Sequence, residues 1–455
     1  MKLSFLLILF FCSWVVIAQR PAKIIEQPAN ITVSKQYRLN SSYREVNMSI
    51  TPDGRYLFFM SSRGEVPWAT PNYTTYKGHS EYDGDIWYSE RIGKDWQAPK
   101  VLDQNINTRA GEDEPNISPD GQTVYFQSWH DADGKSWRTD GGPYYKVSRN
   151  GNYWGTKIGL GSGINDFFVE KGFATDGMSL SPDGKTFVVA CGSDYDGAMD
   201  LYISYFKNGV WTYPQKMTIS TPGDERSPFI AADGETLYFA SEGYQGSGGL
   251  DIFKVSLNEA RTTAFPAVYN IGAPFNTSRH DYGFMITSDG KEVYFIRDGD
   301  IYFADVKKSP KEMKPNKTLV IKGVVRNAKT KAPLNRRITF KNTGGKRQEV
   351  WSNVYSGEYI IVINNPDNNY QESVLKDTKF KGFDKSIVVG EESILTIDID
   401  LEPIESQVDI ALRKKKEEER LRKLEEIRIK KEQERLKKLK LQQELLRNQE
   451  AACRM

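Results

Sequence analysis

The stretch SPDGQTVYF at Ser118–Phe126 decides the fold of this chain. Its Asp-Gly pair is the strongest short-range signal for a β-hairpin, because glycine adopts positive φ at little steric cost and Asp bonds nearby backbone. The apolar run after it is typical of a buried strand. Four further copies, the last two looser, occur at Thr51–Phe59, Ser181–Val189, Ala231–Phe239 and Thr287–Phe295. Five copies predict a repeat architecture.

Each hairpin is followed by further strand-like segments. Third strands are expected at Asp83–Ile92, Gly141–Arg149, Ala198–Phe206, Gly249–Leu257 and Asp298–Val306, and fourth strands after the first four of these. Four short antiparallel strands per unit predict the blades of a β-propeller over residues 30–306. We expect the strand around Gln36–Asn40 to complete the fifth blade and close the ring, which removes an exposed sheet edge. Five blades are predicted; a sixth within Pro67–Ser80 or Gly161–Thr175 is the alternative.

The repeated pattern S-P-D-G-x-x-hydrophobic-aromatic-Phe, followed by Asp-Ile or Asp-Leu and an aromatic residue, resembles the WD40-like PD40 repeats of TolB-type propellers. The fourth and fifth hairpins depart from it at Ala232 and Ser288, and the second unit has Pro143-Tyr144 in place of Asp-Ile. The resemblance implies a bacterial periplasmic propeller. Related envelope proteins of the Bacteroidetes type add a regulatory-like β domain and an OmpA-like module, and some serve outer-membrane or secretion machinery.

A small second β domain is predicted at residues 318–404, after a Lys/Pro-rich linker at 307–317. Alternating strands separated by polar turn clusters favour an all-β sandwich. The order I-x-G-x-V, A-P-L and G-x-Y, beginning at Ile321, Ala332 and Gly357, resembles the carboxypeptidase regulatory-like domain. That resemblance implies a module without catalytic residues.

The two ends of the chain differ sharply in composition. Lys2 and an apolar run from Leu3 to Ala18 predict a cleaved secretory signal at residues 1–18, since a bilayer span needs about 20 apolar residues. The mature chain is therefore expected to be exported, to the periplasm or the outer membrane, with no integral span. Residues 405–455 predict a charged helix or weak coiled coil, with 15 Lys or Arg against 9 Glu from Arg413 to Glu450. Self-association through this helix is one alternative, and a solvated single helix is the other.

No catalytic constellation is visible in the sequence. A Gly-x-Ser-x-Gly nucleophile elbow is missing, and three Cys and three His provide neither a disulfide framework nor a histidine-rich metal site. The near-neutral net charge of +2 gives no case for nucleic acid. Asp clusters such as Asp83/Asp85, Asp194/Asp196/Asp200 and Asp298/Asp300 raise the question of calcium, but their shared repeat position favours a structural role. We therefore predict no catalytic residue, no cofactor and no metal.

Aromatic residues in two long insertions are the remaining candidates for a site. They are Trp68, Tyr73, Tyr76 and, in the second insertion, Trp129 and Trp137. Such loops on a rigid scaffold often carry recognition, although these could equally pack on each other as a lid. The sequence favours a non-enzymatic envelope scaffold that binds protein partners, including outer-membrane complexes. A glycan hydrolase or glycan-binding protein is the alternative; paired carboxylates in the central funnel would favour a hydrolase, and an apolar plug would favour the scaffold.

Overall fold

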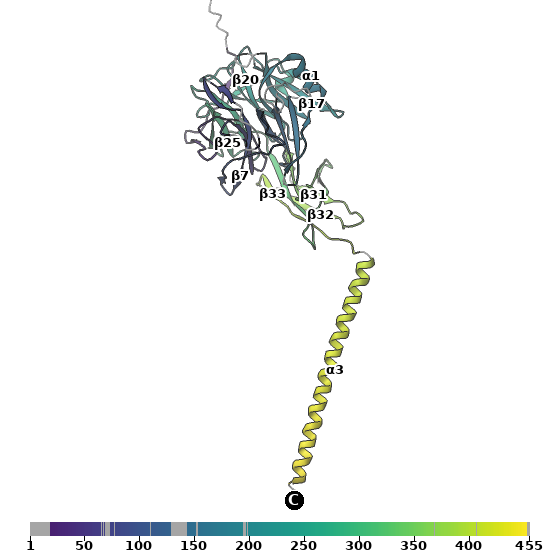
Figure 1. The fold of residues 1–455 in the computed structure, drawn as a ribbon. Coiled ribbons are helices and arrows are strands. Elements are labelled where there is room, and N and C mark those ends of the chain that lie inside the picture. The colour runs from purple at the N-terminus through teal and green to yellow at the C-terminus, as the bar shows by residue number, and fades with distance from the viewer. Residues whose placement is uncertain are drawn as a thin grey trace, which may run out of the picture.

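The structure, a computed structural model, describes residues 19–64, 66, 68, 73–76, 78–109, 111–128, 143–151, 153–193, 197, 199–367, 369–405 and 407–452. The proposed signal sequence at residues 1–18 lies outside them. The prediction of a mainly β protein is confirmed (Figure 1).

Five successive sheets in the described chain build a β-propeller, each with three long antiparallel strands and short outer ones. The inner strands are β3 (Glu45–Ile50), β10 (Glu112–Ile117), β15 (Ala174–Leu180), β20 (Glu225–Ile230) and β24 (Asp281–Ile286). The second strands are β4 (Tyr56–Ser61), β11 (Thr123–Ser128), β16 (Thr186–Gly192), β21 (Thr236–Ser241) and β25 (Glu292–Arg297). The third strands are β7 (Asp85–Ile92), β12 (Tyr144–Asn150), β17 (Met199–Lys207), β22 (Asp251–Ser256) and β26 (Asp300–Asp305). Short outer strands are β8 (Asp95–Trp96), β9 (Lys100–Val101), β13 (Tyr153–Trp154), β14 (Ile158–Gly159), β18 (Val210–Trp211), β19 (Gln215–Lys216) and β23 (Tyr269–Asn270).

The start of the chain closes the ring of sheets. Each inner strand contacts the next, and β24 contacts β3. The fifth sheet gains β2 (Val33–Lys35), which pairs antiparallel with β26. This closing strand lies just before the expected Gln36–Asn40, although the Gln36 N–H still donates to the Ile301 carbonyl over 2.9 Å. In addition, β1 (Lys23–Ile24) pairs parallel with β23 of the fourth sheet, ahead of the boundary expected at residue 30.

The Asp-Gly turns have the conformation that the repeat predicts. Their glycines, Gly54, Gly121, Gly184, Gly234 and Gly290, have φ between 65° and 70°. In the first turn the Thr51 hydroxyl donates to Asp53 over 2.8 Å, and the Tyr56 N–H donates to the Thr51 hydroxyl over 3.0 Å. The Thr51 side chain therefore bonds both to the Asp within the turn and to the first residue of the strand that follows it.

The two stretches considered for a sixth blade form other structures. Tyr73–Tyr76 (β5) and His79–Tyr82 (β6) make an isolated two-stranded hairpin. The other stretch contains α1 (Ser162–Lys171), which buries Ile164, Phe167 and Phe168 against the third sheet. A short helix, α2 (Glu259–Thr262), follows β22. Neither stretch forms a further four-stranded sheet among the described residues.

The second domain is a sandwich of two four-stranded sheets. One contains β27 (Thr318–Asn327), β30 (Glu358–Asn364), β33 (Ile394–Thr396) and β34 (Ile399–Leu401). The other contains β28 (Arg337–Asn342), β29 (Arg347–Trp351), β31 (Asn369–Val374) and β32 (Phe383–Val388). Both sheets bury side chains in one core, Ile321, Phe340 and Tyr359 among them.

The segment between the domains is packed against the propeller. It contains the short 3-10 helix η1 (Lys311–Met313), whose Met313 is fully buried in the propeller core. The Tyr238 hydroxyl donates to the Met313 carbonyl over 2.6 Å. Residues 307–317 therefore fix the sandwich rather than tether it loosely.

The chain ends in α3 (Gln407–Ala452), which projects away from the sandwich (Figure 1). At 1.5 Å per residue its 46 residues extend about 70 Å. Its leucines, such as Leu421 and Leu436, are about half exposed. No helix among the described residues is long and apolar enough to cross a bilayer.

Candidate functional site

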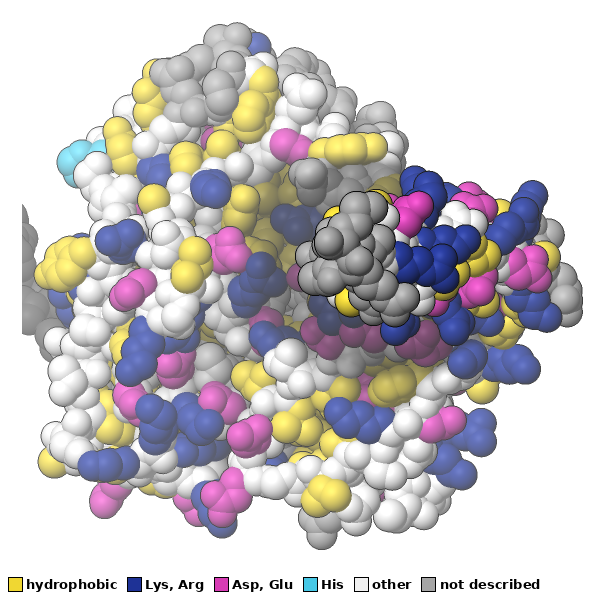
Figure 2. All heavy atoms as spheres, turned by 90° about the horizontal axis from the view of Figure 1, so that it is seen from below, with side chains coloured by type: hydrophobic (Ala, Val, Ile, Leu, Met, Phe, Trp, Pro, Cys, Tyr) yellow, Lys and Arg dark blue, Asp and Glu magenta, His cyan; other side chains and the backbone are white. Residues whose placement is uncertain are grey.

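The sandwich lies over the face of the propeller that carries the Asp-Gly turns, here called the hairpin face. Lys322 pairs with Asp53 at 2.8 Å, and the Asn353 amide donates to Gln122 over 2.6 Å. The Thr318 hydroxyl donates to the Ser288 carbonyl over 2.9 Å. Seen from this side, Lys and Arg side chains are interspersed with Asp and Glu (Figure 2). Polar contacts to at least three blades thus hold the sandwich on this face.

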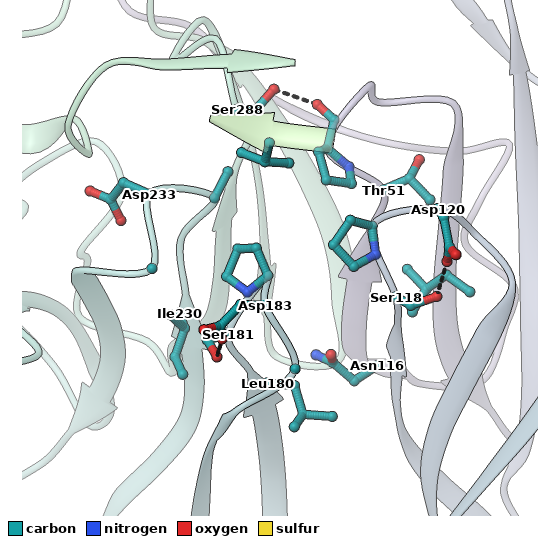
Figure 3. Close-up of a pocket in the computed structure, with 18 of the residues that line it drawn as sticks. Thr51, Asn116, Ser118, Asp120, Leu180, Ser181, Asp183, Ile230, Asp233 and Ser288 are labelled. Carbon is teal, nitrogen blue, oxygen red and sulfur yellow. Dashed lines mark hydrogen bonds between the residues drawn. The ribbon is translucent and has the colours of Figure 1, made fainter. Parts of the chain in front are cut away.

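A cavity of about 830 Å³ lies between the hairpin face and strands β29 and β30 of the sandwich. Residues from all five sheets surround it, including Asn116, Leu180, Ile230 and Ser288 (Figure 3). Two of its carboxylates are held within the turns: Ser118 donates to Asp120 over 2.5 Å and Ser181 to Asp183 over 2.6 Å. The cavity therefore offers mainly neutral polar and apolar groups.

The five inner strands share a bulge at the same position, and the small space that they enclose there is here called the constriction. Asn47, Glu114, Ser227 and Gly283 have φ of 49°, 54°, 49° and 59° there, and Gly177 has φ of 102°. The space left is about 20 Å³, close to the volume that holds one water. Its lining includes the apolar residues Met48, Met178, Phe229, Phe284 and Met285 beside the polar residues Asn47, Glu114 and Ser227.

Carboxylates and arginines gather on the far side of this constriction. Arg226 pairs with Asp176 at 2.5 Å and with Asp224 at 2.7 Å. Burial raises the pKa of Asp113 to about 6, although Asn47 donates to it over 2.9 Å. Burial and the Asp113 charge raise the pKa of Glu114 to about 8. These groups are hydrogen-bonded within the protein rather than directed at an open space.

The candidate residues of the first insertion lie on the face opposite the sandwich, because they follow the end of β4 that is remote from its Asp-Gly turn. Tyr73, 57% exposed, stacks on Tyr82 with ring centroids 5.1 Å apart. The ring centroids of Tyr82 and Tyr43 are 6.3 Å apart. Arg44 and Glu81, each next in sequence to one of these tyrosines, pair at 2.6 Å. Tyr43, Tyr73 and Tyr82 are here called the tyrosine cluster.

The other predicted site residues are not members of this cluster. Trp68 is 38% exposed and its indole N–H donates to the Asn107 carbonyl over 3.0 Å. Tyr76 lies in β5, and Trp129 and Trp137 lie outside the described residues. No sequence pattern singled out Tyr43, although it lies two residues before the first inner strand, β3, and so at the same end of the blade as the insertion.

The described residues contain no group of three or more His, Cys, Asp or Glu side chains arranged to hold a metal ion. Of the Asp clusters considered for calcium, Asp194 and Asp196 lie outside the described residues. Asp200 and Asp300 pair instead with Lys216 and Lys35, both at 2.7 Å.

Comparisons with known proteins give structural likenesses only. No family model and no curated protein matches the chain. TolB from Acinetobacter baumannii is 17% identical with a TM-score of 0.33, over 60% of this chain and 57% of that one. A putative TolB from Agrobacterium tumefaciens is 16% identical with a TM-score of 0.35, over 74% of this chain and 98% of that one. A gluconolactonase from Xanthomonas campestris is 9% identical with a TM-score of 0.32, over 61% of this chain and 90% of that one. At these scores the propeller assignment depends on the sheet topology of the chain itself.

Proposed function

We propose that this protein is a non-enzymatic scaffold of the bacterial envelope that binds a protein partner through the face opposite the sandwich. The observation that carries the proposal is the arrangement of the two faces. The hairpin face contacts the sandwich, the inner strands enclose a space of only about 20 Å³ at their shared bulge, and the exposed tyrosine cluster lies on the other face. Exposed tyrosines supply large amphipathic contact area at low entropic cost, as protein-binding surfaces require.

The remaining parts of the proposal come from the sequence. The chain is exported to the periplasm or to the outer membrane, and the TolB-like propeller has five blades. The sandwich is a regulatory-like spacer of the carboxypeptidase type. Helix α3 couples the body to a partner, for which an outer-membrane complex is one candidate, and self-association through α3 is the alternative.

Site-specific photo-crosslinking in the native envelope tests the partner face. A photoreactive residue replaces Tyr73 or Tyr43 in one set of variants, and Phe265, 87% exposed in the fourth blade, in the matched control. We expect one defined protein to be crosslinked from Tyr73 and Tyr43 and not from Phe265. Equal crosslinking from all three positions, or none from the tyrosines in a folded protein, would contradict the proposal.

A glycan hydrolase is the second candidate. Burial raises the pKa values of Asp113 and Glu114, and Asp176, which pairs with Arg226, supplies a further carboxylate. A general acid needs such a raised pKa, and a partner carboxylate must stay ionised. Purified protein and its Asp113→Asn variant would be assayed on a panel of envelope glycans. Hydrolysis by the wild type that the variant loses would favour the enzyme over the scaffold.

A further inference from the structure

The sandwich presents two edge strands to the cavity of about 830 Å³ that lies above the hairpin face. In the described chain β30 pairs only with β27, and β29 pairs only with β28, so each is the last strand of its sheet. Ile360, Ile361 and Val362 of β30 line the cavity, and so do Glu349 and Val350 of β29. The cavity therefore borders strands that have one side without a neighbour.

The register of β27 and β30 shows which peptide groups are on that side. Val320 of β27 lies opposite Val362, and Lys322 lies opposite Ile360. The Val320 N–H donates to the Ser393 carbonyl over 2.8 Å, and the Lys322 carbonyl accepts a bond from the turn between β33 and β34 over 2.7 Å. Both residues thus bond away from β30. Because opposite residues in antiparallel strands alternate between bonded and non-bonded pairs, the N–H and C=O groups of Ile360 and Val362 point away from β27.

These outward peptide groups have no backbone partner in the described chain. The Asn353 N–H donates to the Glu358 carbonyl over 2.7 Å, where the chain enters β30. Beyond this bond no backbone hydrogen bond joins β29 to β30 among the described residues. A row of unpaired N–H and C=O groups on an edge strand is a template for pairing with another chain.

The space beside this edge suits an extended segment. The side chains of Ile360 and Val362 lie on the opposite side of β30 from Tyr359, which packs in the sandwich core. Leu180 and Ile230 line the cavity from the third and fourth propeller sheets (Figure 3). The volume is in the range of about 300–1,000 Å³ typical of pockets that enclose a whole ligand. An added strand would therefore have apolar contacts for its alternate side chains as well as main-chain partners.

The charged residues of the lining are mostly acidic. They are Asp120, Asp183, Asp233, Glu235 and Glu349, against the single base Lys185. Asp120 and Asp183 belong to the turns of neighbouring sheets at the cavity (Figure 3). The first turn shows what such an Asp can hold, because Asp53 pairs with the Lys322 ammonium at 2.8 Å. A segment that enters the cavity is therefore expected to carry Lys or Arg.

We propose that this cavity binds an extended, basic peptide segment of a partner protein, which adds as a strand to the edge of β30. Its main chain bonds to the outward groups of Ile360 and Val362, and its Lys or Arg side chain binds Asp120 or Asp183. In such strand addition the main-chain bonds give affinity and the alternate side chains give specificity. A compact small molecule would leave the row of edge groups unpaired. The site is separate from the tyrosine cluster and does not depend on it.

The test uses short linear peptides of random sequence, displayed on phage and selected on the immobilised full chain. We expect enriched peptides to alternate apolar residues with others and to contain Lys or Arg. Val362→Pro removes one outward N–H, which an edge strand tolerates because β27 does not use it. Val362→Thr keeps that N–H and is the matched control. By fluorescence anisotropy, an enriched peptide should bind Val362→Pro about tenfold more weakly than wild type and Val362→Thr equally well.

Equal binding by Val362→Pro and wild type would overturn strand addition, and a wild-type chain that enriches no peptide would overturn the site. The double variant Asp120→Asn with Asp183→Asn should weaken an enriched peptide but not its Lys→Gln counterpart. Loss of neither would contradict the charge assignment.

Hydrogen exchange of the wild-type chain keeps the proposal falsifiable if Val362→Pro does not fold. Saturation with the synthetic peptide should slow amide exchange in the fragment that contains Ile360–Val362. The other edge strand of the second sheet, β32, should exchange as before. Protection of the Tyr73 segment instead would place the peptide on the opposite face, which would overturn this inference and leave the proposed partner face standing.

Discussion

Lys322 of the sandwich donates a hydrogen bond to Asp53 of the first Asp-Gly turn over 2.8 Å. Burial raises the pKa of Asp53, but the Lys322 hydrogen bond and charge, with help from Thr51 and Arg55, more than offset it and hold that pKa below its ordinary value. One ion pair therefore joins the repeat that builds the propeller to the domain that covers it.

Replacing Lys322 with Met should loosen the sandwich, because it leaves the Asp53 carboxylate 10% exposed without its cation. We expect a loss of about 1–3 kcal/mol and faster proteolysis between the domains. Since the pKa of Asp53 is lowered, the wild-type contribution is present above the ordinary Asp value and disappears as pH falls through the folded one. Lys331→Met, which breaks an exposed pair with Asp400, is the control. Equal losses in the two variants would show that the docking contact is unimportant.

Met313 should be the main anchor of the segment that leads to the sandwich. Met313→Ala removes a fully buried side chain from the propeller core and should lower the free energy of unfolding by about 2–5 kcal/mol. Lys311→Ala, two residues earlier and exposed, should change it little. Calorimetry of both variants provides the measurement. A Met313→Ala protein as stable as the control would mean that the segment is a loose tether.

The Asp-Gly turns can be tested at Gly121, which has φ of 67° and nothing within 4 Å of an added Cβ. Gly121→Ala should cost about 1–2 kcal/mol from backbone strain alone. Gly121→Asn should cost less, because Asn adopts positive φ more readily. The control Gly64→Ala, also in open space but without positive φ, should be nearly neutral. The free energy of unfolding of each variant is measured by denaturant titration. Equal losses of stability in Gly121→Ala and Gly64→Ala would contradict the turn assignment.

Local signals were predictable, and contacts between distant segments were not. Asp53-Gly54 and its four counterparts specify their turns within a few residues, so the five turns lie at the positions predicted from the sequence. The closing strand is Val33–Lys35 rather than Gln36–Asn40, because its register depends on β26, more than 260 residues away. The docking of Lys322 on Asp53 has no local signature at all. Tyr73 was found as an exposed aromatic, but its stacking on Tyr82 depends on the β5–β6 register.

The ring should depend on its first strands. A variant lacking Gln19–Lys35 loses β1 and β2 and exposes the outer edges of β26 and β23. Unpaired edges template association, so we expect a lower melting temperature and aggregation in light scattering. Deleting Gln407–Ala452 instead should leave the melting temperature of the body unchanged, because no blade contains α3. A monomeric first variant with wild-type stability would show that closure is dispensable.

Helix α3 should persist without its leucines. Glu419 pairs with Lys423 at 3.0 Å one turn later, and such pairs with good helix formers support a solvated helix. Replacing four half-exposed leucines with Ala, at Leu421, Leu424, Leu436 and Leu439, keeps these pairs and raises helix propensity. We expect unchanged helicity in circular dichroism and unchanged mass in sedimentation of the full chain. A parallel variant with Glu419→Gln should lose some helicity, chiefly at low salt. If the leucine variant instead loses both helicity and mass, α3 is a coiled coil and the self-association alternative is correct.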